Sequence, residues 1–544
     1  MSKNQNQYNW LKILTGSYVL TMLIACASVQ SPTGGPKDVQ PPKVISEEPK
    51  NLTRNFKSKT IELGFDELVK LTNTATEISI SPALDVLPTF KIRKNFLDIT
   101  FEDTLEKNTT YTINFGKAVG DVNENNILKN YTYVFSTGDK IDSLSISGKV
   151  TSALTQESLQ DVTVFLLPVR QDTLFGKKRA SIFTSTDSSG NYSIKNLRED
   201  TYRVYALKEQ TGGNRIYNGT NEEIGFVTEP VKLTKDTANV NIQVFKEVPE
   251  RLAFTERKIE GDGRITLILN KPAQDPGVKI TDPVALDARK VTEFTANRDS
   301  ALMWIPEMTF DSLQVALTDT GRNMDTVMLR RNKRDTYTRN IFITENTTGG
   351  RLKPGTDLML TTSTPVTSFD AQQFSLLQDS VAVNGIQVTR VNGSTRKFSV
   401  KYPWRSERNY ELNISEGAFT DLYGTKSKAS VKTFTLDDPE NYGNLTVQVK
   451  APDTTTSILV QLLNNQDEIL RTDSVPPSGR IQYISFPVGK YMLRFVYDIN
   501  KNGKWDTGSV REKRQPEKVF NYQKTLALRP NWDIEEPVTI PPAQ

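Results

Sequence analysis

The sequence has no histidine and only one cysteine among its 544 residues. Without histidine it cannot build a Ser-His-Asp or Cys-His nucleophilic site, a histidine metal site or a histidine pH switch. A lone cysteine rules out a disulfide within the chain and a cluster of thiolate metal ligands. No glycine-rich phosphate loop leads from a strand into a helix, and the formal net charge is only +4. We therefore expect a protein that is not an enzyme and binds neither nucleotide nor nucleic acid.

The start of the chain has the pattern of an export signal. An apolar run precedes Cys26, and the stretch Leu23-Ile24-Ala25-Cys26 resembles the lipobox at which bacterial lipoproteins are cut and acylated. The next residue is Ala27, where an inner-membrane retention signal would have Asp. We predict a lipoprotein signal peptide over 1–25 and a lipid anchor on Cys26 in the outer membrane. The anchored protein would face either the periplasm or the cell surface. A plain secretory signal and an N-terminal anchor helix remain the alternatives.

Short alternating runs replace helical periodicity in the rest of the chain. Residues 26–42 are rich in Pro, Gly, Ser and Gln, which predicts a flexible tether. Later runs such as 60–65 and 397–400 alternate apolar with polar residues, and Gly, Asn, Asp and Pro separate the runs. This pattern is typical of half-buried antiparallel strands. We predict an all-β, elongated, multi-domain chain of β-sandwiches.

Two internal repeats indicate a modular chain. Residues 109–137 are similar to 408–435, each with a strand, a turn containing an aspartate, and a closing strand. Residues 202–217 are similar to 491–506, each with a strand that runs into a polar loop. Repetition of such units is typical of proteins built from successive β modules.

Two stretches resemble known domain families. Residues 41–137 resemble the bacterial Ig-like domain of the S-layer type (Big_5), through Pro41-Pro42 and the runs 61–66 and 135–138. Residues 146–245 resemble a transthyretin-like, carboxypeptidase-regulatory-like domain, through the run 186–197. The whole layout resembles Ig-like-domain lipoproteins of Bacteroidota. The resemblance implies a fold and a cell-envelope location but little biochemistry.

These observations divide the chain into successive parts. The predicted parts are a signal peptide 1–25, a tether 26–42, an Ig-like domain 43–139, a transthyretin-like domain 143–247, a β-sandwich 248–335, a second Ig-like domain 336–437, a C-terminal β domain 440–530 with a loop at Asp498, and a tail 531–544.

The loop at Asp498 carries the sharpest local motif. Asp498, Asn500, Asn502, Lys504 and Asp506 match the first nine positions of a calcium loop, with Lys504 offering its carbonyl. The twelfth position is a serine instead of the usual bidentate glutamate. Two interpretations stay open: a calcium site, which would be the only cofactor, and a plain β-turn centred on the Asn-Gly pair.

The predicted function follows from the architecture. We predict a non-catalytic outer-membrane lipoprotein that acts as a structural and interaction scaffold, as an accessory subunit of an outer-membrane β-barrel, assembly or secretion complex. Its partners would be membrane lipid, through the acyl chains, and envelope proteins. The alternative is a surface adhesin or glycan-binding lipoprotein, for which Trp404, Trp505 and Trp532 are the candidate sugar-stacking residues.

Overall fold

The computed structural model describes residues 37–542, except 83, 85, 103, 211–212, 333, 452–456 and 477. Strands dominate the described residues, and the prediction of an all-β chain is confirmed. The predicted signal peptide, Cys26 and the tether up to residue 36 lie outside the described part. Within that part, none of the helices has the length and apolar character needed to cross a bilayer.

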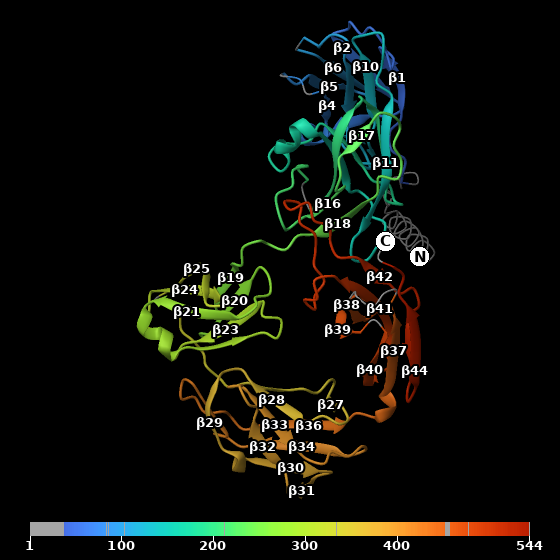
Figure 1. Ribbon diagram of the computed structural model, residues 1–544. Helices are drawn as coiled ribbons and strands as arrows, with labels where there is room; N and C mark the ends of the chain where they lie inside the picture. The colour runs from blue at the N-terminus through green and yellow to red at the C-terminus, as the bar shows by residue number, and fades with distance from the viewer. Residues whose placement is uncertain are drawn as a thin grey trace, which may run out of the picture. The chain divides into compact units, whose positions relative to one another are not determined.

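The chain forms two compact units, one ending at Ser143 and the other starting at Leu144. The first unit contains one group of strands, here called segment one (44–136), and the second contains four, called segments two (144–246), three (254–330), four (343–436) and five (442–540). Figure 1 labels many of these strands along the chain.

Segment one consists of two main sheets and a small third sheet. The main sheets have the orders β1-β2-β6-β5 and β10-β7-β4. Its elements are β1 (Val44–Glu48), β2 (Thr60–Phe65), β3 (Val69–Leu71), α2 (Thr74–Glu77), β4 (Ser79–Ser81), β5 (Thr89–Arg93), β6 (Phe96–Thr100), β7 (Thr110–Asn114), β8 (Val119–Asp121), β9 (Ile127–Leu128) and β10 (Thr132–Ser136).

Segment two is built on an eight-stranded sheet of order β13-β12-β15-β16-β18-β11-β14, with β17 also paired to β15. Its elements are β11 (Leu144–Ser152), β12 (Thr163–Pro168), η1 (Val169–Leu174), β13 (Ile182–Ser185), β14 (Asn191–Leu197), β15 (Asp200–Lys208), β16 (Glu223–Phe226), β17 (Val231–Leu233) and β18 (Ile242–Lys246).

Segments three and four repeat the two-sheet plan of segment one. Segment three contains β19 (Phe254–Ile259), β20 (Ile265–Leu269), β21 (Pro276–Asp282), η2 (Val284–Arg289), β22 (Val291–Phe294), β23 (Ser300–Trp304), β24 (Ser312–Asp319) and β25 (Arg322–Arg330). Segment four contains β26 (Ile343–Glu345), β27 (Arg351–Leu352), β28 (Leu358–Thr362), β29 (Val366–Phe369), η3 (Ala371–Gln373), β30 (Phe374–Gln378), β31 (Val381–Val383), β32 (Gln387–Arg390), β33 (Lys397–Lys401), β34 (Asn409–Ile414), β35 (Phe419–Asp421) and β36 (Ser430–Leu436).

The same strand order recurs in segments one, three and four. The four-stranded sheets run β1-β2-β6-β5, β19-β20-β23-β22 and β26-β28-β33-β32 in segments one, three and four. The first internal repeat of the sequence has the same packing in both copies: Tyr111 stacks on Phe135 at 5.3 Å between ring centres, and Tyr410 on Phe434 at 5.5 Å. Each pair lies directly opposite across neighbouring antiparallel strands, where aromatic pairs stabilise a sheet.

Segment five repeats the strand pairing of segment two. Its elements are η4 (Pro439–Asn441), just before the first strand, and β37 (Tyr442–Lys450), β38 (Ser457–Leu463), β39 (Ile469–Val475), β40 (Ser478–Pro487), β41 (Gly489–Asp498), β42 (Val519–Asn521), β43 (Leu526–Leu528) and β44 (Asp533–Thr539). In both segments a central strand (β15 or β41) pairs with three others, and the first strand (β11 or β37) pairs in parallel with the last. The second internal repeat of the sequence therefore marks two segments that share these strand pairs, although β16 and β18 join segment two into one sheet while the strands of segment five form two.

The interpretation of residues 531–544 as a tail outside the last β domain was wrong. Strand β44 pairs in parallel with β37 along its whole length. Val538 and Ile540 are each 1% exposed and belong to the core of segment five. The alternation was hard to recognise because Glu536 occupies an inward position, where it accepts hydrogen bonds from Tyr522 and Lys524.

Candidate functional site

The predicted calcium loop begins at the last residue of β41. The Asp498 residue is 1% exposed. One carboxylate oxygen accepts the N–H of Asn502 and the other accepts the N–H of Gly503, both at 3.0 Å. Gly503 has a φ of 75°, a backbone conformation that glycine adopts without steric cost. The loop therefore turns tightly around a buried carboxylate.

The other predicted ligands lie in the same turn and bind one another. The side-chain amides of Asn500 and Asn502 both donate to Asp506 Oδ2, Asn502 at 2.8 Å. The side-chain oxygen of Asn502 accepts the N–H of Lys504 at 2.8 Å. Among the described residues, no group of three or more His, Cys, Asp or Glu is placed to hold a metal ion. These hydrogen bonds join side chains to groups of the same loop, and calcium binding stays a prediction.

Glu517 closes the loop, although the sequence motif did not single it out. It is 8% exposed, and its two carboxylate oxygens accept the N–H of Ile499 at 2.8 Å and of Asp506 at 3.0 Å. The Trp505 indole N–H donates to the Glu517 carbonyl at 2.9 Å. Burial raises the pKa of the Glu517 carboxyl, and the nearby charges of Asp506 and Asp498 raise it further. Glu517 lies far beyond the twelfth motif position, so the spacing rule could not find it.

The tip of this loop lies on segment two. The Val510 N–H donates to Glu247 Oε1 at 2.7 Å, and the side-chain amide of Gln515 donates to the Phe226 carbonyl at 2.8 Å. Val510 is 4% exposed and packs within a hydrophobic cluster that otherwise comes from segment two, apart from a contribution by Trp505. Residues about 260 positions apart in the sequence therefore share one apolar core.

Lys513 contacts the aromatic side chains of that core. Its Nζ donates to Tyr205 Oη at 2.8 Å and lies 5.0 Å from the centre of the Tyr205 ring. The rings of Phe175 and Phe226 are each 5.8 Å from the same nitrogen, and Asp172 Oδ2 is 3.9 Å away. Burial lowers the pKa of the Lys513 amine, and the charge of Asp172 acts in the opposite direction. An ammonium group among aromatic rings and a carboxylate is held by cation–π and charge attraction together.

A second set of contacts joins the same two segments. The side-chain amide of Asn521 donates to the carbonyls of Leu154 at 3.0 Å and Thr155 at 3.1 Å. The Gln156 side chain donates to the Val519 carbonyl at 2.7 Å. All these contacts come from side chains or loop N–H groups, and no strand of segment two pairs with a strand of segment five in the described residues.

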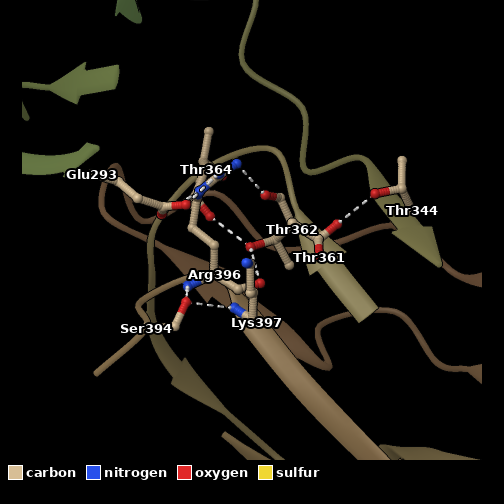
Figure 2. Close-up of polar contacts among 8 residues, drawn as sticks. All are labelled: Glu293, Thr344, Thr361, Thr362, Thr364, Ser394, Arg396 and Lys397. Carbon is tan, nitrogen blue, oxygen red and sulfur yellow. Dashed lines mark hydrogen bonds and ion pairs between the residues drawn. The ribbon is translucent and has the colours of Figure 1, made fainter. Parts of the chain in front are cut away.

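A guanidinium group joins segments three and four. Figure 2 shows Arg396 beside Glu293. The guanidinium donates two hydrogen bonds of 2.8 Å to the carboxylate and a third, of 2.9 Å, to the Thr362 carbonyl. The Arg396 side chain is 12% exposed and its guanidinium lies 5.0 Å from the ring of the buried Trp304. Arg396 holds the pKa of the Glu293 carboxyl below its usual range. Such two-pronged, partly buried pairs fix geometry as well as adding stability.

The three candidate sugar-stacking tryptophans differ in exposure. Trp404 packs against the core of segment four, and Trp505 against the cluster that joins segments two and five. Trp532 is 50% exposed, with the guanidinium of Arg529 4.9 Å from its ring. The structure does not bring the three rings together on one open surface, since two of them pack into cores.

Comparisons with known proteins identify one part of the chain. Residues 38–137 match the family described as Bacterial Ig-like domain, Big_5. No curated protein matches the chain.

Solved structures show only distant likeness. The Bacillus anthracis TIE protein is 11% identical (TM-score 0.14), over 99% of this chain and 79% of that one. BcpA, the major pilin subunit of Bacillus cereus, is 9% identical (TM-score 0.14), over 73% and 99%. SGBP-B of the Bacteroides ovatus mixed-linkage glucan utilization locus, solved with a heptasaccharide, is 12% identical (TM-score 0.19), over 62% and 86%. Such TM-scores support no inference about function. The chain is a multi-domain all-β protein that contains a bacterial Ig-like domain.

Proposed function

We propose that this protein is a non-catalytic lipoprotein of the outer membrane, anchored through an acylated Cys26, that serves as a structural and interaction scaffold. It would act on the periplasmic or the cell-surface face as an accessory subunit of a β-barrel, assembly or secretion complex. The observation that carries this proposal is the set of specific side-chain contacts that join segment two to five and segment three to four. Modules held to one another in this way can present loops to partners at a fixed spacing.

The finer domain assignments belong to the same proposal. The shared strand order of segments one, three and four supports an Ig-like fold for 248–335 and 336–437 as well as for 43–139. Segment two would be the transthyretin-like domain 143–247, and the matching strand pairs of segment five support a second domain of that kind, extending beyond residue 530. None of these folds carries catalytic chemistry by itself, since function depends on sites built onto the fold.

The lipid anchor is tested with Cys26→Ser in a Gram-negative host. The unchanged protein should incorporate labelled palmitate and sediment with outer membranes, because several acyl chains hold a protein firmly on a bilayer. The serine variant should be unlabelled and leave the membrane fraction. Equal labelling and equal sedimentation of both proteins would contradict a lipoprotein.

The scaffold role is tested by crosslinking in intact cells, followed by identification of captured proteins. We expect an envelope protein in stoichiometric yield. A variant with Arg396→Ala and Glu293→Ala lacks the ion pair that joins segments three and four, and it should capture less of this envelope protein. Capture of no stoichiometric partner would contradict the scaffold.

A further inference from the structure

The eight-stranded sheet of segment two has two apolar faces. On β12, Val164 and Leu166 belong to one hydrophobic cluster, whereas Phe165 belongs to another. On β15, Val204 and Tyr205 divide in the same way. Neighbouring residues of a strand point to opposite faces, so the second face is a separate surface rich in aromatic rings. An apolar surface of this kind needs another part of the chain or a partner to cover it.

The loop 499–518 of segment five covers part of this aromatic face. Gly508 lies so close that a Cβ atom there would come within 2.4 Å of the Phe245 ring. Val510 fills an apolar site beside Glu247, and Lys513 lies over Tyr205. Because no strand pairing is involved, the loop can leave the face without opening a sheet.

The face offers partners matched to a tight turn, since Ser509 and Arg514 form an antiparallel bridge that closes the turn from Val510 to Lys513. Glu247 accepts a backbone N–H, the Phe226 carbonyl accepts a side-chain amide, and the Tyr205 hydroxyl accepts an ammonium hydrogen. Asp172 adds a negative charge beside that ammonium group. Recognition of an aliphatic side chain followed three residues later by a lysine is therefore built into segment two.

We propose that the aromatic face of segment two is a peptide-binding surface and that the loop 499–518 is a detachable clasp occupying it within the same chain. Asp498 and Glu517 position the clasp, since their carboxylates hold the N–H groups at its base. Release of the clasp would uncover the face for the same segment of a second copy of this chain. The inference does not depend on the lipid anchor or on the envelope location.

The first measurement is release of the clasp in the full chain. Val510→Asp places a charge in the apolar site, and Glu517→Ala removes the carboxylate that accepts the N–H groups of Ile499 and Asp506 at the base of the loop. Both should speed hydrogen exchange over 507–515 and trypsin cleavage after Lys513. Glu512→Gln, at an exposed position of the same loop, is the matched control and should change neither. Unchanged exchange in both test variants would overturn the proposal.

The second measurement is binding of a labelled peptide with the sequence of residues 499–518. The Val510→Asp chain should bind it about tenfold more tightly than the unchanged chain, because apparent affinity scales with the fraction of free surface. The same peptide carrying Val510→Asp should not bind. Equal, absent or sequence-independent peptide binding would overturn the proposal. Loss of hydrogen-exchange protection in β15 and β41 of the variant would also overturn it, because the clasp could then not leave without unfolding of the two segments.

Discussion

At the scale of single residues, buried aspartates organise the turns of this protein. Asp121, Asp421 and Asp498 are each 1% exposed. Each accepts hydrogen bonds from backbone N–H groups of the loop that follows it. A carboxylate in this position satisfies donors that a tight turn leaves without partners in the backbone. The sequence shows this most clearly at Asp498, because an Asp followed by Asn and Gly predicts a turn.

The calcium prediction is tested on the full chain by calorimetry. Calcium that binds only the folded loop would stabilise it by RT ln(1 + [L]/Kd), which is about 2.7 kcal/mol at a hundred times Kd. The melting temperature should therefore rise with calcium and fall with chelator, and Asp506→Asn should abolish the difference. Identical melting temperatures in calcium and in chelator would contradict calcium binding, and only the β-turn interpretation would remain.

The pair of Arg396 and Glu293 predicts a loss of stability in acid. A pKa held below its usual range means that the ionised Glu293 stabilises the folded state above about pH 4.3, the ordinary value for glutamate. This contribution is lost as the pH falls through the lower, folded-state pKa. Glu293→Gln should cost about 1–3 kcal/mol at neutral pH and reduce the acid dependence of unfolding.

The control for that pair is Glu307→Gln. Glu307 pairs with Arg289 in the same segment, but both side chains are about half exposed. Exposed pairs contribute about 0–1 kcal/mol, so this variant should unfold almost like the unchanged protein. Equal effects of the two substitutions would contradict a special role for Glu293. Denaturant unfolding at neutral and acid pH provides the measurement.

At the scale of elements, the protein repeats two strand plans. One plan appears in segments one, three and four, and the other in segments two and five. In the second plan, a parallel pair of strands joins the beginning of each segment to its end. Segment five therefore includes β44 as a full member of its three-stranded sheet.

Removal of residues 531–544 tests this dependence. The shortened chain loses one of the two strands paired with β37 and the buried side chains of Val538 and Ile540. Burial of each large aliphatic side chain contributes about 1.5–3 kcal/mol, so segment five should melt at a much lower temperature or fail to fold. Removal of 543–544 alone is the control and should have no effect. Equal melting of both shortened chains would contradict a structural role for β44.

Sequence pattern predicted much of this architecture but not how its parts meet. The alternation of runs such as 60–65 and the repeat of 109–137 in 408–435 depend on local side-chain periodicity, which a single sequence displays. Glu517 could not be predicted in the same way, because it holds residues 11 and 18 positions before it and lies outside the motif spacing. Lys513 could not be predicted either, because its partner Tyr205 lies 308 positions away and no local period encodes such a contact.

At the scale of the whole molecule, the chain consists of two compact units that meet in sequence between Ser143 and Leu144. Segment one forms its own core from residues 56–135, and segments two to five form theirs after residue 144. A boundary of this kind predicts that the two units fold without each other.

This prediction is tested by producing 37–143 and 144–544 separately. Each should show a cooperative thermal transition, and the calorimetric trace of the whole chain should equal their sum. A cut inside the second unit, into 144–335 and 336–544, should instead lower the melting temperature, because it removes the covalent link between residues such as Glu247 and Val510 that contact each other. A single shared transition that neither piece reproduces would contradict two independent units.

The position of the loop 499–518 in the sequence sets an order of events during synthesis. The strands of segment two are complete by Lys246, but the residues that cover its aromatic face are made about 260 residues later. At typical elongation rates of about 5–20 residues per second, the aromatic face of a nascent chain stays uncovered for about ten seconds or more. A holding chaperone that shields aromatic surfaces would therefore protect the growing chain from aggregation until the loop 499–518 has been made.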